Sequence, residues 1–126
     1  MPGRRGGGGG RGRRRQGLMG FLRPCLLFLL AKDDAHGYSL LDELAEFGID
    51  PGQIDPSLVY RALRDMEEAG WVASEWGEES QGPQRRVYRI VPEGKTYLAD
   101  LMVGLRRRRD EIDHLLQVYE KEVQEE

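Results

Sequence analysis

Four side chains that can donate hydrogen bonds lie between residues 57 and 64 of this 126-residue chain. Arg61 and Arg64 are three residues apart, so on a helix both guanidinium groups share a face, where each can donate to base acceptors or to phosphates. Ser57 and Tyr60 precede them and supply hydroxyl groups. A short helix with these residues near its N-terminal end has the size and the chemistry to enter a DNA major groove.

The segment 55–70 is predicted to be the helix that carries these side chains. Asp55 can cap the helix, Pro56 has the fixed φ of a first turn, and Gly70 can take the left-handed conformation that ends helices. Apolar residues recur at steps of three and four and form one face: Leu58, Val59, Ala62, Leu63, Met66 and Ala69. The pattern also fits an amphipathic core helix with a solvated charged face, and periodicity alone does not separate the two interpretations.

A two-stranded β-hairpin is predicted after this helix. Residues 71–76 and 85–91 alternate in polarity, and the segment 77–83 between them contains two Gly and a Pro, which is typical of a turn. The turn is longer than two residues, so the tip of the hairpin should project. Arg85 and Arg86 beside it could then reach a minor groove or the DNA backbone.

Two helices are expected earlier in the chain. Residues 21–32 are apolar nearly all round, which is typical of a helix buried on every side, and Pro24 fits its first turn. Residues 38–47 form the second helix, after a polar connection over residues 33–37. Residues 48–54 contain two Gly and a Pro and are predicted to be a loop.

Residues 92–119 are predicted to form a long helix that pairs with a second copy of the chain. Its apolar residues keep a heptad-like spacing, and a body of this size cannot bury both this seam and the segment 21–32. The seam consists of Leu98, Leu101, Leu105, Ile112, Leu115 and Tyr119, with Arg108 at one position of the repeat. Acidic residues follow the basic run 106–109, so pairs within the helix account for that run.

The net charge of −3 hides an uneven distribution. Residues 1–20 contain six Arg and no acid, whereas the rest contains 13 basic and 22 acidic residues. The Gly/Arg-rich segment 1–19 is expected to be a disordered arm that either follows DNA phosphates or only keeps the protein in solution. The single cysteine, Cys25, fits a reducing cytosol, and the longest apolar run is too short to span a membrane.

An enzyme is not expected. The two histidines, His36 and His114, lie in different predicted elements, and no Ser/His/Asp or Cys/His spacing suggests a nucleophilic site. No cluster of Cys and His could hold zinc, so neither a metal nor another cofactor is predicted.

Several motifs resemble the PadR family of transcriptional regulators. They are His36-Gly37-Tyr38, the run YRALRDMEEAGWV over residues 60–72, SEW over residues 74–76 and RVYRI over residues 86–90. The resemblance implies a mainly α-helical chain with a winged helix-turn-helix over residues 20–91 and a dimerisation helix with a tail over residues 92–126. The chain resembles the short PadR subfamily, which has a single C-terminal helix.

The resemblance also implies a function and a set of contacts. PadR-like proteins are typically cytoplasmic homodimers that bind a double-stranded operator, usually repress transcription and are released by an effector. The positions that match their DNA-binding residues are Tyr38, Pro56, Ser57, Tyr60, Arg61, Arg64, Arg85 and Arg86. Drug-binding members of the short subfamily have a tryptophan on the C-terminal helix, whereas this chain has no tryptophan after Trp76.

Two further expectations remain open at this point. The excess of apolar surface suggests that the dimer centre holds a small apolar effector, lined by Leu22, Leu26, Met102 and Leu105. Alternatively, the acidic body and exposed carboxylates such as Glu67 fit a winged-helix module for protein or ligand interaction that does not recognise an operator.

Overall fold

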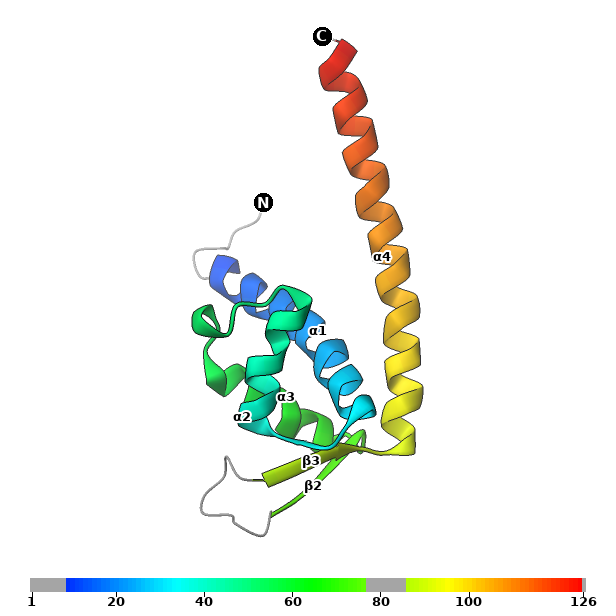
Figure 1. Ribbon diagram of the computed structural model, residues 1–126. Helices are drawn as coiled ribbons and strands as arrows, with labels where there is room; N and C mark the ends of the chain where they lie inside the picture. The colour runs from blue at the N-terminus through cyan, green and yellow to red at the C-terminus, as the bar shows by residue number, and fades with distance from the viewer. Residues whose placement is uncertain (1–8, 77–85, 126) are drawn as a thin grey trace.

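The computed structural model describes residues 9–76 and 86–125, with side chains from residue 20 onward. Figure 1 shows a helical body, a small sheet at its lower edge and one helix that extends far beyond the body. The fold class predicted from the sequence is confirmed. The elements are α1 (Gly9–Lys32), β1 (Ala35–His36), α2 (Gly37–Glu43), the 3₁₀ helices η1 (Leu44–Phe47) and η2 (Pro51–Gln53), α3 (Pro56–Glu68), β2 (Val72–Trp76), β3 (Arg86–Ile90) and α4 (Pro92–Glu125).

Helix α3 forms as its capping residues predict. The carboxylate of Asp55 accepts a hydrogen bond from the backbone N–H of Ser57 at 3.0 Å, and Pro56 occupies the first turn. Gly70 ends the helix with a φ of +86°. Of the predicted apolar face of α3, Val59, Ala62, Leu63 and Met66 are fully buried and Leu58 is half-buried. Ala69 is exposed, because it follows the last residue of the helix.

Helix α1 supplies most of the remaining core, through Leu22, Leu26, Leu27, Leu29 and Leu30. It differs from the prediction in three ways. Its backbone is helical from Gly9, inside the expected arm. Pro24 lies inside the helix rather than in its first turn, and the backbone carbonyl that loses its N–H partner belongs to the exposed Gly20. Within this single chain α1 is not buried on every side, because Phe21 and Phe28 are exposed.

The sheet has three strands, in the order β1-β3-β2, and all neighbouring pairs are antiparallel. The predicted hairpin is present, with Val72 opposite Ile90 and Trp76 opposite Arg86. The third strand, β1, was expected to be a polar connection. It pairs Ala35 with Tyr88 and so joins the segment before α2 to the hairpin.

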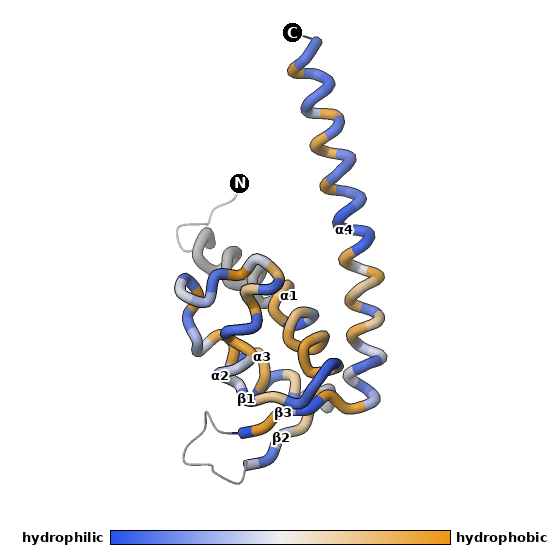
Figure 2. The backbone as a smooth tube through the Cα atoms, viewed as in Figure 1, coloured by the Kyte–Doolittle hydropathy of each residue, from blue (hydrophilic) through white to orange (hydrophobic). Residues whose placement is uncertain are grey.

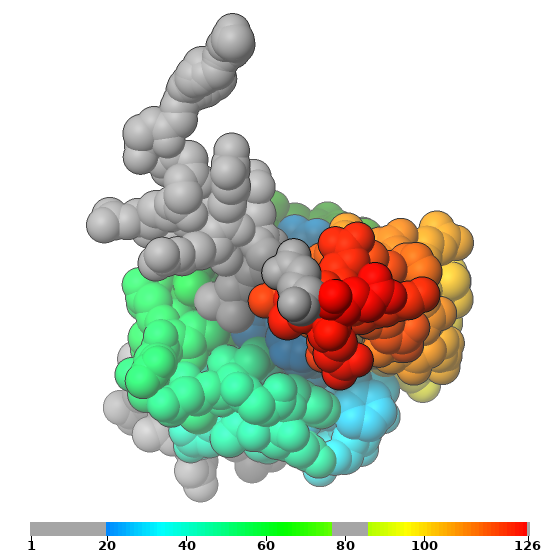
Figure 3. All heavy atoms as spheres, turned by 90° about the horizontal axis from the view of Figure 1, so that it is seen from above, coloured from blue at the N-terminus to red at the C-terminus, as the bar shows by residue number. Residues whose placement is uncertain are grey.

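Helix α4 leaves the sheet at Pro92 and packs against α1 only along its first part. At about 1.5 Å per residue, its 34 residues reach roughly 51 Å. Figure 2 shows apolar positions continuing along the part of α4 that projects from the body. In Figure 3, α4 stands at one side of the molecule and the segment with α2 and the 3₁₀ helices at the other. No helix in the described part of the chain combines the length and apolar character needed to cross a membrane.

The base of α4 is fixed to the sheet by an aromatic pair. The ring of Trp71 stacks on that of Tyr97 with centroids 3.6 Å apart and an interplanar angle of 11°. Gly94 is required beside this pair, because a Cβ atom there would collide with the backbone carbonyl oxygen of Trp71. The base of α4 therefore packs closely against the residue that precedes β2.

Candidate nucleic-acid interface

The structure brings the predicted α3 residues onto one accessible face. Pro56, Ser57, Arg61 and Arg64 are exposed, and Tyr60 is half-buried. The apolar residues of the same helix face the core, so α3 presents its polar side outward near its N-terminal end. Such a helix presents guanidinium and hydroxyl donors together in the way that a groove-binding helix requires.

Tyr38 lies at the start of α2, next to this face. Its ring stacks on that of His36 with centroids 5.2 Å apart. The preceding residue, Gly37, lies directly against α3, because a Cβ atom added there would be 2.5 Å from Cε1 of Tyr60. Glycine at this position lets the start of α2 approach the ring of Tyr60 closely, which places Tyr38 beside the α3 face.

Arg86 is held on the sheet rather than extended from it. Its Nε donates a hydrogen bond to Oγ of Ser74 at 3.0 Å, and that hydroxyl donates to both carboxylate oxygens of Glu67 at 2.9 and 3.0 Å. The guanidinium carbon also lies 4.8 Å from the ring centroid of Trp76. The other predicted wing residue, Arg85, lies outside the described residues.

The prediction that Glu67 is an exposed carboxylate is wrong. Glu67 is half-buried, and through Ser74 it links α3 to the arginine of β3. The three residues are separated by 7 and 12 positions in the chain, so only the register of the hairpin brings them together. The sequence contains no local signal for this link.

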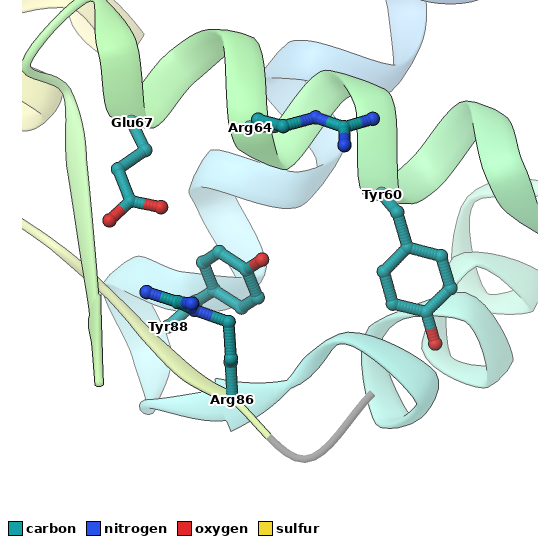
Figure 4. A pocket seen from close by; sticks show the side chains of 5 residues that line it. All are labelled: Tyr60, Arg64, Glu67, Arg86 and Tyr88. Atoms are coloured by element: carbon teal, nitrogen blue, oxygen red, sulfur yellow. The ribbon is translucent and has the colours of Figure 1, made fainter. Parts of the chain in front are cut away.

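A pocket of about 270 Å³ lies between α3 and β3, lined by Tyr60, Arg64, Glu67, Arg86 and Tyr88. Figure 4 shows the hydroxyl of Tyr88 and the guanidinium of Arg64 at the same open space, with the ring of Tyr60 across from them. Burial raises the pKa of Tyr88 and the charge of Glu67 raises it further, while Arg86 and Arg64 lower it. Burial also raises the pKa of Tyr60, so both phenols stay protonated near neutral pH.

A second, apolar groove of about 270 Å³ lies between α1 and α4, lined by Phe21, Pro24, Cys25, Phe28, Phe47, Met102 and Leu105. Two of the four predicted effector-pocket residues, Met102 and Leu105, are therefore at this groove. The other two, Leu22 and Leu26, are fully buried in the core of the chain, because they lie on the side of α1 that the body covers. Burial raises the pKa of the Cys25 thiol to about 11, so this thiol is neutral.

The predicted dimer residues divide into two groups. Leu98 and Leu101 pack against the core, and Leu105 lines the apolar groove. Farther along α4, apolar side chains are exposed within the single chain: Ile112 (49%), Leu115 (66%) and Tyr119 (62%), together with Leu116, Val118 and Val123, which lie outside the predicted seam.

Two ion pairs form within the charged run of α4. Arg108 and Glu111 are 3.4 Å apart, and Arg109 contacts the neighbouring Asp110 at 3.2 Å. Both pairs are well exposed and contribute little to stability. Within the part of the chain that the structure describes, no group of three or more His, Cys, Asp or Glu side chains could hold a metal ion.

Known proteins with related sequences and folds give an independent comparison. A family model described as the transcriptional regulator PadR-like family matches residues 26–100. A curated protein from Lysinibacillus sphaericus, described as uncharacterized protein X, is 28% identical over 85 residues, which span 68% of this chain and 78% of that protein.

Two solved structures share both the fold and a substantial part of the sequence. TA0346 from Thermoplasma acidophilum, a candidate transcriptional regulator, is 35% identical with a TM-score of 0.68, over 81% of this chain and 96% of that one. TM0937, a conserved protein of unknown function described as a potential transcriptional factor, is also 35% identical, with a TM-score of 0.69. That match covers 98% of this chain and 99% of the other.

Proposed function

Because the chain belongs to the PadR-like family of transcriptional regulators, it is a DNA-binding regulator, and we propose that it is a homodimeric repressor released by an effector. The observation that carries the proposal is the two-sided character of α3. Four residues of its apolar face, from Val59 to Met66, are fully buried, while Ser57, Arg61 and Arg64 are exposed on the opposite side. That side would enter the major groove, with Tyr38 and Pro56 beside it.

Dimerisation is supported by the distal half of α4. This half projects from the body and carries exposed apolar side chains at helical spacing, among them Ile112, Leu115 and Tyr119. A second copy of the same helix would cover them. Two α3 helices related by twofold symmetry would then read a near-palindromic operator, with half-sites about one helical turn, roughly 34–36 Å, apart.

Release by an effector is supported by the apolar groove between α1 and α4. Its lining is almost entirely apolar, which suits a small apolar molecule, and it lies where the winged domain meets the proposed dimer helix. A ligand that binds better to one spacing of the two α3 helices would shift the protein toward that spacing. From the family membership we infer that the protein works in the cytoplasm, on the nucleoid.

Selection of bound fragments from genomic or random DNA tests the proposal directly. We expect a near-palindromic site to be enriched, and Arg61→Ala should weaken binding to it. Arg107→Ala is the matched control, because it removes the same charge from an exposed site on α4. If the selected DNA has no common sequence, the alternative of an interaction module without operator recognition is favoured.

A further inference from the structure

The pocket between α3 and β3 brings together hydrogen-bond donors from two elements. The Arg64 guanidinium comes from α3 and the Tyr88 hydroxyl from β3, and Figure 4 shows both at one open space. Among the described residues, Arg64 forms no hydrogen bond or ion pair. Tyr88 is only 6% exposed, so its ring is held by packing and its side chain loses little entropy when the hydroxyl binds a ligand.

The third donor group of the pocket, Arg86, is positioned by the protein itself. Ser74 and, through it, Glu67 fix the Nε side of the guanidinium, which leaves its two terminal nitrogens for other partners. Glu67 and Arg64 both project from α3 in Figure 4, where the guanidinium of Arg64 extends away from the carboxylate of Glu67. Both oxygens of that carboxylate accept from Ser74, so Glu67 lines the pocket and also orients Arg86.

The charges of the lining indicate which anion fits. Two guanidinium groups and one carboxylate leave a net charge of about +1. A phosphodiester carries a single negative charge and balances it, whereas a phosphomonoester carries about −1.5 to −2 near neutral pH and leaves an excess. The pocket also opens beside the exposed face of α3, where a DNA strand would pass.

We propose that this pocket binds one phosphodiester group of the DNA backbone, with Arg64 and Tyr88 as its ligands and Arg86 as a third donor held by Ser74 and Glu67. This assignment rests on the proposed function, because it takes DNA as the partner. It divides the two arginines of α3 by role: Arg64 contacts the backbone regardless of sequence, and Arg61 is left to read bases.

The variant Tyr88→Phe tests the pocket, because it removes one hydroxyl and keeps the buried ring. Tyr97→Phe is the matched control: it removes the same atom from a tyrosine that stacks on Trp71 outside the pocket. The probe is a 20-base-pair duplex of arbitrary sequence, with binding measured by fluorescence anisotropy over a range of salt concentrations. Thermal unfolding of each variant shows whether it is folded.

We expect Tyr88→Phe to weaken binding about tenfold at every salt concentration, because a hydrogen bond to a charged group is lost while no charge changes. Arg64→Ala should weaken binding and also lower the slope of log affinity against log salt by about 1. Tyr97→Phe should bind as the wild type does. If folded Tyr88→Phe also binds as the wild type, or if Arg64→Ala keeps the full slope, the proposal is wrong.

A second arm separates the DNA backbone from a free anion. Inorganic phosphate is added at constant ionic strength, with sulfate as the reference salt. If phosphate displaces the duplex from the wild type more than sulfate does, but not from Tyr88→Phe, the pocket belongs to a free phosphate and the assignment to DNA is overturned. If the proposed function fails but the pocket assignment holds, the result is different. The wild type then binds this duplex and selects no operator from random DNA, while the variants still show the losses stated above.

Discussion

Helix α3 and the distal half of α4 have the same kind of sequence pattern and opposite surroundings. Both have apolar residues at steps of three and four, yet Leu63 and Met66 of α3 are fully buried, whereas Ile112 and Leu115 of α4 are exposed. An apolar repeat therefore predicts a helix and the face that needs covering, but not which chain covers it. The rest of this chain covers α3, and we propose that a second copy covers α4.

The largest effect is expected when a charge is placed in the proposed seam. Leu115→Glu would bury a carboxylate from each copy without a partner, at a cost of about 3–5 kcal/mol per charge. We expect the dimer to separate into folded monomers, as measured by light scattering after gel filtration. Gln124→Glu adds the same charge to an exposed position of α4 outside the seam and should leave the dimer intact. A monomeric wild type would remove the basis of the comparison.

The matching change in α3 should act on folding instead of assembly. Leu63→Ala removes a fully buried side chain and should lower the free energy of unfolding by about 2–5 kcal/mol. Urea denaturation followed by circular dichroism measures this loss. The loss should persist in the monomeric Leu115→Glu background, because only this chain surrounds Leu63. If it disappears there, α3 also depends on the partner and the contrast with α4 is incorrect.

Two glycines sharpen the comparison further. Gly37→Ala places a methyl group against the ring of Tyr60 and should cost about 1–3 kcal/mol, because α2 and α3 must separate slightly. Gly104→Ala makes the same change in α4, where no heavy atom lies within 4 Å, and should stabilise the helix by up to about 1 kcal/mol. The midpoint temperature of thermal unfolding should therefore fall in Gly37→Ala and rise in Gly104→Ala. Equal shifts would mean that the approach of α2 to Tyr60 does not restrict residue 37.

The sequence predicts best those features that neighbouring residues determine. The ends of α3 follow from Asp55, Pro56 and Gly70, and the structure has that helix within one or two residues of the predicted range. Strand β1 could not be predicted, because two residues show no alternation and its pairing with β3 spans about fifty positions. A local sequence pattern predicts the propensity of its own segment, but it does not predict which distant segment will pair with it.

The same limit explains the errors at the sites. Leu22 and Leu26 were assigned to a pocket because an almost uniformly apolar helix gives no sign of which face the body covers. The sequence predicts an exposed carboxylate at Glu67, because its link to Arg86 exists only once the hairpin register is set. The exposed face of α3, in contrast, followed directly from the positions of Arg61 and Arg64.

The smallest predicted effect concerns Cys25, at the groove between α1 and α4. Burial raises the pKa of its thiol from an ordinary value of 9.0 to about 11. Between these values the unfolded chain releases the thiol proton while the folded chain retains it, so the folded state loses stability as pH rises from about 9 to 11. Well below pH 9, as at pH 7.5, the thiol is protonated in both states and has almost no effect.

At pH 9.5 the loss should be below about 1 kcal/mol, and it is measured as the difference in urea midpoint between pH 7.5 and pH 9.5. Cys25→Ala is the control, because it removes the thiol but leaves the tyrosines, whose ionisation acts in the same pH range. The wild type should lose more stability than this variant over that interval. Equal losses would mean that the thiol is solvated, and that the groove beside α1 is open to water in the folded protein rather than closed around an apolar occupant or a second copy of the chain.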